Sequence, residues 1–189
     1  MVLLGYLAGS VPWGVVLTRA FAPQVDLRGS GSGNIGATNV RRTAGWQLGL
    51  ATLAADTAKG ALPVLIAKWI PLGESAVALV AAAAFLGHLY PLYTGLKGGG
   101  KGVATLGGCL MVLSPLTLAV CLGGFLVVAA TFRRVSAASL TAVTLMPLGI
   151  WGFDASAPLT LWAVAVMALV WYRHRSNIHR MLQGTEPRI

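Results

Sequence analysis

GSGSGNIGATNVRR, residues 29–42, is a polar, glycine-dense stretch in a chain that is otherwise mostly hydrocarbon. Its four glycines allow the backbone to bring N–H groups close to a ligand. Short hydrogen-bonding side chains separate these glycines, and two arginines end the stretch. Backbone N–H groups together with guanidinium groups suit a phosphate or another oxyanion. The stretch predicts an anion-binding loop, and a flexible linker between two hydrophobic segments is the alternative.

The composition around this stretch favours a membrane protein. Hydrophobic residues make up 56% of the 189 residues and charged residues only 10%, whereas soluble domains carry about 25% charged residues. The apolar runs are continuous and do not alternate, which favours helices over a β-barrel. We therefore expect an all-α integral membrane protein that forms a single catalytic domain over residues 1–189.

The net charge of +9 comes from 14 basic and five acidic residues. In a membrane protein the positive-inside rule explains such an excess, so nucleic-acid binding is not predicted. Cys109 and Cys121 lie in apolar segments, which indicates neither a disulfide nor a metal site. We predict no metal, no cofactor and no obligate protein partner.

Seven short membrane spans are expected. The apolar run 103–132 would be about 45 Å long as one helix, against a hydrocarbon core of about 30 Å. Ser114-Pro115 is therefore expected to divide it, because a residue before proline avoids the helical region. The first span is expected to be uncleaved and loosened near Pro12. The expected spans are Val2 to Ala20, Trp46 to Trp69, Ala76 to Tyr93, the two halves of 103–132, Ser136 to Gly152 and Pro158 to Tyr172.

The positive-inside rule orients these spans. With the N-terminus outside, the inside segments collect twelve basic residues: Arg19, Arg28, Arg41, Arg42, Lys97, Lys101, Arg133, Arg134, Arg173, Arg175, Arg180 and Arg188. Both glycine-rich stretches and the C-terminal tail are then expected to face the cytoplasm.

Asp56 and Lys59 lie within the second expected span, three residues apart on one helical face. Charges at membrane depth are costly and usually face the bundle interior or a wet cavity. Two interpretations are open, a structural ion pair that pins two helices and a direct contact with substrate.

A second polar stretch, GLKGGGKGVAT, covers residues 95–105, and His88 lies seven residues before it. Gly95 and Gly100-Lys101 match the GxxxxGK part of a P-loop. Gly102, however, stands where Ser or Thr would hold magnesium, and an apolar helix precedes the stretch. We predict phosphate binding by glycine amides and a lysine, with a flexible turn as the alternative.

Several of these segments together resemble a known family. SGNIGATNVRR, DTAKGALP and GHLYPLYTGLKGGGKGVAT look like three motifs of the bacterial PlsY-type glycerol-3-phosphate acyltransferases, and RVSAASL and RHRSNIHRMLQGTEP look like its later segments. The resemblance implies a multi-pass enzyme of the inner membrane with a cytoplasmic active site. It would transfer a fatty acyl group from acyl phosphate to the 1-hydroxyl of glycerol 3-phosphate, giving lysophosphatidic acid and phosphate in the first acylation of phospholipid synthesis.

The resemblance also implies site residues. The catalytic residues would be Ser32, His88 and Lys101, and substrate would be bound by Asn34, Thr38, Asn39, Arg42, Gly99, Gly100, Ser139 and Asn177. Three glycines precede Lys101 where family members commonly carry two. Arg41 occupies a position that is usually apolar, so Arg42 is the arginine that we assign to the site.

The chemistry of these side chains agrees with that reaction. Both substrates are anions, which suits Arg42 and Lys101 beside amide-rich loops. Acyl phosphate already carries a good leaving group, so no covalent enzyme intermediate is required. His88 and Ser32 would position the attacking hydroxyl, and either His88 or a substrate phosphate would accept its proton. The HxxxxD motif of other glycerolipid acyltransferases is missing, since Tyr93 follows His88 by five residues and His179 follows His174 by five. A conventional His–Asp base pair is therefore not expected.

The sequence fits two other functions less well. A transporter for phosphorylated metabolites would place polar residues for access from both sides, whereas here they concentrate on one side. A non-catalytic scaffold would explain the membrane spans but not the clustered glycines, the cations and His88. An enzyme supplied from the cytoplasm is favoured.

Overall fold

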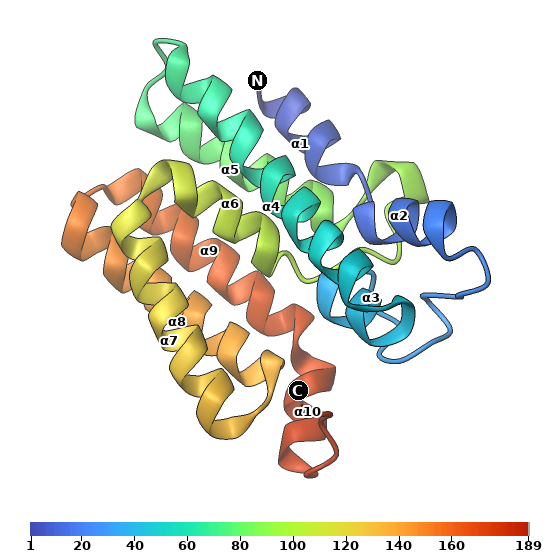
Figure 1. Ribbon diagram of the computed structural model, residues 1–189. Coiled ribbons are helices and arrows are strands. Elements are labelled where there is room, and N and C mark those ends of the chain that lie inside the picture. The colour runs from blue at the N-terminus through green and yellow to red at the C-terminus, as the bar shows by residue number, and fades with distance from the viewer. Residues whose placement is uncertain (189) are drawn as a thin grey trace. The chain divides into compact units, whose positions relative to one another are not determined.

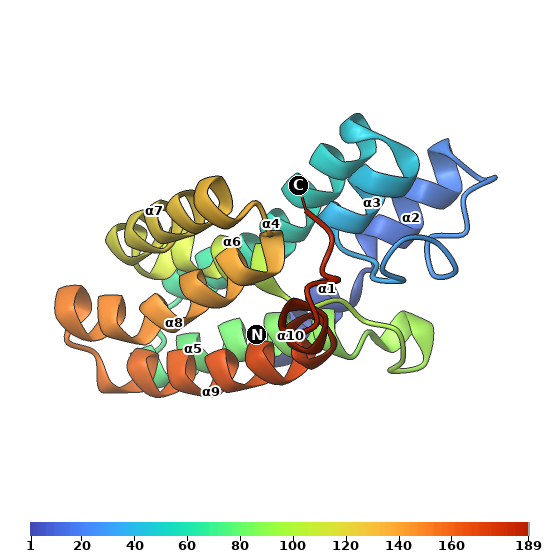
Figure 2. The same ribbon diagram turned by 90° about the horizontal axis from the view of Figure 1, so that it is seen from below.

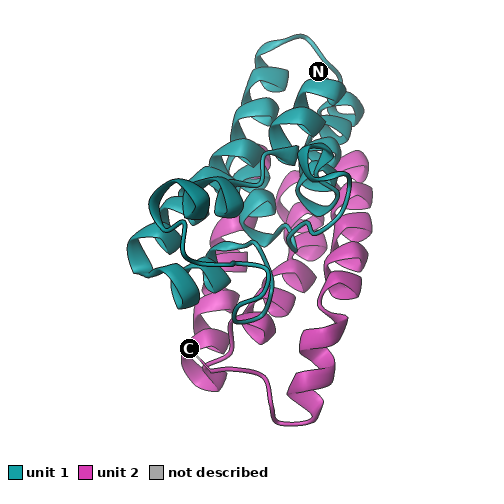
Figure 3. Cartoon of the chain, turned by 90° about the vertical axis from the view of Figure 1, so that its right-hand side faces the viewer, with its two compact units in different colours: residues 1–112 teal, residues 113–189 magenta. Residues whose placement is uncertain are grey.

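The structure, a computed structural model, describes residues 1–188, which form helices joined by turns and loops and contain no strand (Figure 1). The all-helical prediction is confirmed. The chain divides into two compact units, Met1–Val112 and Leu113–Ile189 (Figure 3). That the whole chain acts as one catalytic domain stays a prediction.

The first unit contains six helices and one short 3-10 turn. Its first expected span is divided, because Pro12 has no N–H to donate and interrupts the helix. The elements are α1 (Val2–Ser10), α2 (Trp13–Phe21), α3 (Ala37–Ala44), α4 (Trp46–Trp69), α5 (Glu74–Leu89), η1 (Leu92–Thr94) and α6 (Val103–Leu113), whose last residue begins the second unit.

Glycines allow the helices of this unit to approach closely. The Cα of Gly9 in α1 lies against the backbone of Ala84 in α5, so that a Cβ would not fit. In the same way Gly108 in α6 lies against the carbonyl of Thr57 in α4. Without side chains at such positions the backbones gain close van der Waals contact, as is common between helices in membranes.

The second unit consists of α7 (Pro115–Phe132), α8 (Val135–Asp154), α9 (Ala157–Arg173) and the short α10 (Arg175–Leu182). Figure 2 shows α8 between α7 and α9. Tight turns join these helices, with Arg133 and Ala155 in the left-handed region at φ 53° and 49°. The break expected at Ser114-Pro115 is confirmed.

Among residues 1–188, five helical segments are long and apolar enough to cross a membrane: Val2–Phe21, Trp46–Trp69, Glu74–Thr94, Pro115–Phe132 and Val135–Asp154. Two shorter apolar helices, Val103–Leu113 and Ala157–Arg173, coincide with the other two expected spans. The sequence did not predict α3 and α10, which are short polar helices in regions that were expected to be a loop and a tail.

Neighbouring glycines in α6 provide a matched test of this packing. A Cβ at Gly108 would overlap the Thr57 carbonyl, whereas a Cβ at Gly107 meets nothing within 4 Å. We expect Gly108→Ala to destabilise the protein by about 1–3 kcal/mol through overpacking. Gly107→Ala is expected to be neutral or to stabilise, because alanine favours a helix by about 1 kcal/mol over glycine. Thermal unfolding of both variants in detergent measures the difference, and equal midpoints would contradict this packing.

Candidate active site

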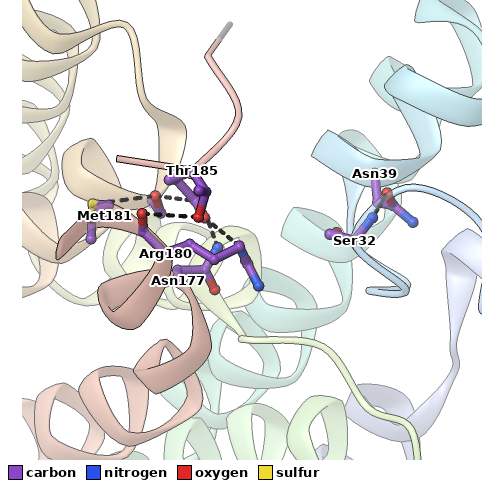
Figure 4. A network of polar contacts seen from close by, with 8 residues as sticks. Ser32, Asn39, Asn177, Arg180, Met181 and Thr185 are labelled. Atoms are coloured by element: carbon purple, nitrogen blue, oxygen red, sulfur yellow. Dashed lines mark hydrogen bonds and ion pairs between the residues drawn. The ribbon is translucent and has the colours of Figure 1, made fainter. Parts of the chain in front are cut away.

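The first glycine-rich stretch is held closed by Asn39. This side chain is only 2% exposed. Its Oδ1 accepts a hydrogen bond from the Ser32 N–H at 2.8 Å, and its Nδ2 donates to the carbonyls of Leu27 and Ser30, both at 3.1 Å. Figure 4 shows Asn39 beside Ser32. Because these contacts occupy the Asn39 amide, it holds the loop in shape, and Ser32 is exposed at the loop's surface.

The rest of this loop also has a defined conformation. The Oδ1 of Asn34 accepts from the Gly36 N–H at 2.8 Å. Gly31 and Gly33 have φ of 61° and 67°, which glycine adopts without strain. Beneath the loop, Leu27, Ile35 and Val40 form a hydrophobic cluster. These contacts argue against a flexible linker.

Helix α3 presents two of the expected binding residues on one face. Thr38 and Arg42 are four residues apart, so their side chains are neighbours on the helix surface, and both are exposed. Asn39 and Val40 face the interior. Arg41 is exposed as well, and its Cβ lies beside Gly49 of α4.

The second glycine-rich stretch folds over the end of α5. The Gly100 N–H donates to the His88 carbonyl at 3.2 Å. The Cα of Gly100 also lies against His88 Nε2, and the Cα of Gly99 lies against the Leu89 carbonyl, so neither position has room for a side chain. The glycines therefore let the loop pass over His88 just before the half-buried Lys101.

Arg28 connects the two glycine-rich loops. A Cβ at Gly98 would lie 2.9 Å from the Cζ of Arg28, so the guanidinium packs directly on this glycine. The φ of Gly98 is 66°, a left-handed conformation that also favours glycine over other residues at this position. Sequence reasoning did not assign Arg28 to the site, although it directly precedes the first loop. Its contact shows that the two expected anion-binding loops meet in the folded chain.

A buried polar cluster lies around the His88 ring. Asp56 Oδ1 is 2.8 Å from Lys59 Nζ and 3.7 Å from His88 Nδ1, and Thr105 Oγ1 is 3.3 Å from the same ring nitrogen. Lys59 Nζ also donates to the Val11 carbonyl at 2.8 Å. The Asp56–Lys59 ion pair, one of the two interpretations left open by the sequence, is present. The sequence analysis did not predict that Asp56 reaches His88 from another helix, because it considered only the HxxxxD spacing.

Within residues 1–188, no three His, Cys, Asp or Glu side chains are grouped as a metal site would require. The Cys109 thiol donates to the Gly60 carbonyl at 3.6 Å, and Cys121 is buried in α7. Both cysteines therefore contribute to helix packing.

The second unit has its own polar cluster, centred on Glu186. The Glu186 carboxylate accepts hydrogen bonds from Asn177 Nδ2 at 2.7 Å, Ser136 Oγ at 2.8 Å and Arg180 Nε at 2.7 Å (Figure 4). Burial alone would raise the pKa of this carboxyl, but these donors and the Arg180 charge outweigh burial and leave the pKa below its ordinary value. The cluster fastens the tail to α8 and α10.

Ser139 and Asn177 both belong to the second unit and are buried. Asn177 has a structural partner in Glu186, and Ser139 lies on α8, one turn after Ser136. Their contact with substrate stays a prediction from the resemblance.

The Glu186 cluster predicts an acid-sensitive fold. A carboxylate whose folded-state pKa is depressed stabilises the fold fully above its unfolded pKa of 4.5, and that stability is lost as the pH falls below it. We expect the thermal midpoint of the wild-type protein to drop more steeply below pH 4.5 than that of Glu186→Gln. Thermal scans of both proteins over a pH series check this, and parallel curves would contradict it.

Comparison with known proteins identifies the family of this chain. A model of the family described as glycerol-3-phosphate acyltransferase matches residues 1–184. The glycerol-3-phosphate acyltransferase of Syntrophotalea carbinolica is 47% identical over 189 residues, which cover 100% of this chain and 95% of the relative. That of Geobacter sulfurreducens is 43% identical over 98% of this chain and 94% of the relative.

Two solved structures have the same fold. One is the crystal structure of PlsY, an integral membrane glycerol 3-phosphate acyltransferase, in its glycerol 3-phosphate form, with a TM-score of 0.94 and 38% identity. The other is its lysophosphatidic acid form, with a TM-score of 0.91 and 37% identity. Each match covers 100% of this chain and 93% of the solved chain. On these grounds the chain belongs to the glycerol-3-phosphate acyltransferase family and is an acyltransferase.

Proposed function

We propose that this enzyme transfers a fatty acyl group from acyl phosphate to the 1-hydroxyl of sn-glycerol 3-phosphate, giving lysophosphatidic acid and phosphate. The observation that carries the proposal is the fold of the second glycine-rich loop over His88, which lays Gly100 against the imidazole just before Lys101 in the chain. The relatives named for glycerol 3-phosphate and lysophosphatidic acid support the acceptor and the product. The reaction would be the first acylation of phospholipid synthesis.

Substrate recognition follows from the charges. Glycerol 3-phosphate and acyl phosphate both carry phosphate groups. The exposed Arg42, which follows the first loop in α3, and the half-buried Lys101 of the second loop supply cations. Charge-assisted hydrogen bonds to phosphate are shorter and stronger than neutral ones. Ser32, Asn34 and Thr38 add hydroxyl and amide groups on the first loop and α3, while Gly99 and Gly100 bring the second loop close.

In the transfer step, the 1-hydroxyl oxygen attacks the acyl carbonyl carbon, and the bond from that carbon to the phosphate oxygen breaks. Phosphate leaves with the bonding electrons, and the hydroxyl proton passes to His88 or to a phosphate oxygen. Ser32 and His88 orient the hydroxyl, and holding reactants in attack geometry lowers the barrier substantially. Lys101 and the loop amides stabilise the charge that develops on the oxygens.

The membrane topology that fits this function has seven spans, with the N-terminus outside and the C-terminus in the cytoplasm of a bacterium. The five long and two short apolar helices support the number, and the distribution of basic residues supports the orientation. The glycine-rich loops would then face the cytoplasm, where glycerol 3-phosphate is available, and the acyl chain would lie in the bilayer.

The donor is tested with purified protein, glycerol 3-phosphate and one of three donors: acyl phosphate, acyl-CoA or acyl-carrier protein. We expect lysophosphatidic acid and phosphate only with acyl phosphate. His88→Ala and Lys101→Ala are expected to insert and fold but to lose transfer. Product formed solely from acyl-CoA would refute the donor, and full activity in both variants would refute the site.

Arg41 and Arg42 provide a matched pair for the phosphate contact, because both are exposed at the end of the same helix. We expect Arg42→Gln to raise the KM for glycerol 3-phosphate by about 10- to 100-fold, since a hydrogen bond to a charged group contributes about 1.5–3 kcal/mol. Arg41→Gln is expected to change KM by less than about threefold. Steady-state kinetics of both variants measure the KM for glycerol 3-phosphate. Equal changes in this KM would argue against Arg42 as the phosphate ligand.

A further inference from the structure

Asp56 is a buried carboxylate in a membrane-spanning helix, and the ion pair with Lys59 does not by itself explain its place. It is only 2% exposed, and such a charge is costly to bury. Two apolar side chains would fill the space at no cost in stability, since buried ion pairs rarely stabilise more than apolar residues of similar volume. The ion pair alone therefore does not explain why these two charged side chains are buried.

Lys59 holds the break between α1 and α2. The Val15 N–H donates to the Pro12 carbonyl at 2.9 Å, although in a continuous helix it would donate to Val11. The Val11 carbonyl instead receives Lys59 Nζ at 2.8 Å and the Trp13 N–H at 3.0 Å. Lys59 thus ties this break to α4 and keeps a positive charge beside Asp56.

Asp56 in turn faces the ring of His88. An ionised carboxylate only accepts hydrogen bonds, and the nearest ring nitrogen, Nδ1, is 3.7 Å from Asp56 Oδ1. If Nδ1 were unprotonated, its lone pair would face a negative oxygen in a buried site. A proton on Nδ1 removes this repulsion, and Thr105 Oγ1 at 3.3 Å can share the same proton as a second acceptor.

We infer that Asp56 is a positioning residue that keeps the proton of a neutral His88 ring on Nδ1. The other nitrogen, Nε2, lies against Gly100 in the second glycine-rich loop. Without a proton, Nε2 accepts a hydrogen bond from the substrate hydroxyl and orients one oxygen lone pair toward the acyl carbon. The catalytic part of this inference rests on the proposed function, whereas the position of the ring proton does not.

The wild-type protein tests the proton position directly. The protein contains three histidines, His88, His174 and His179. All three are labelled with ¹⁵N, and the signals of His88 are assigned by their loss in the His88→Gln variant. Nitrogen chemical shifts near neutral pH distinguish the two tautomers. We expect a neutral ring with the proton on Nδ1. A ring protonated on Nε2, whether neutral or cationic, would overturn the inference.

The double variant Asp56→Leu/Lys59→Met tests the consequence for the reaction. Removing both charges leaves no unpaired ion, so the protein is expected to fold. We expect kcat to fall about 100-fold, as misplaced reacting groups commonly cost, while KM for glycerol 3-phosphate changes less than about threefold. The His88 proton is expected to redistribute toward Nε2. Unchanged kcat together with an unchanged tautomer would show that Asp56 is purely structural.

Two further variants complete the design. Thr52→Val removes another buried polar group from the same face of α4, one turn away, and is expected to retain kcat within about threefold. Asp56→Asn/Lys59→Met preserves the side-chain volume at position 56, leaves no unpaired charge and gives the same readouts if the first double variant does not fold. A wild-type protein with the proton on Nδ1 but no acyl transfer would refute the proposed function alone. An active enzyme with the proton on Nε2 would refute this inference alone.

Discussion

The Asp56–Lys59 ion pair links three parts of the first unit: α4, the break between α1 and α2, and the end of α5. Lys59 reaches the Val11 carbonyl where the first span breaks, and Asp56 reaches His88 on α5. Because removal of one buried partner leaves an uncompensated charge, at a cost of about 3–5 kcal/mol, these three elements have few alternative arrangements. The close helix contacts at Gly9, Gly60 and Gly108 bring the backbones near enough for these side chains to meet.

The anion-binding groups are built on this buried framework. The backbone carbonyl of His88 accepts a hydrogen bond from the Gly100 N–H and so positions the second loop. Asn39 closes the first loop, and Arg28 packs on Gly98 to join the two loops. The exposed side chains that we assign to substrate binding need little support of their own, because buried hydrogen bonds fix the backbone beneath them. An acyltransferase that uses no covalent intermediate depends on such preorganisation, since positioning and electrostatics must supply its rate.

The sequence predicted the parts of this structure that depend on local patterns. Continuous apolar runs identified the long helices, and Pro12 and Pro115 marked the two breaks. The helices α3 and α10 were missed because each is only eight residues long and five of the eight are polar, a composition typical of a loop. The Asp56–His88 contact was missed because a fixed HxxxxD spacing reports only partners that are close in sequence. Likewise, the pattern could not show that Asn39 points inward while Thr38 points outward, which depends on the packing of α3.

The central claim is that the two joined glycine-rich loops bind the phosphate of the acceptor and bring its hydroxyl to His88. A crystal structure of this protein with sn-glycerol 3-phosphate tests it most directly. The account predicts the phosphate in contact with Arg42 and Lys101 and the 1-hydroxyl within hydrogen-bonding distance of His88 Nε2. A phosphate bound away from both loops, or a hydroxyl directed away from His88, would contradict it.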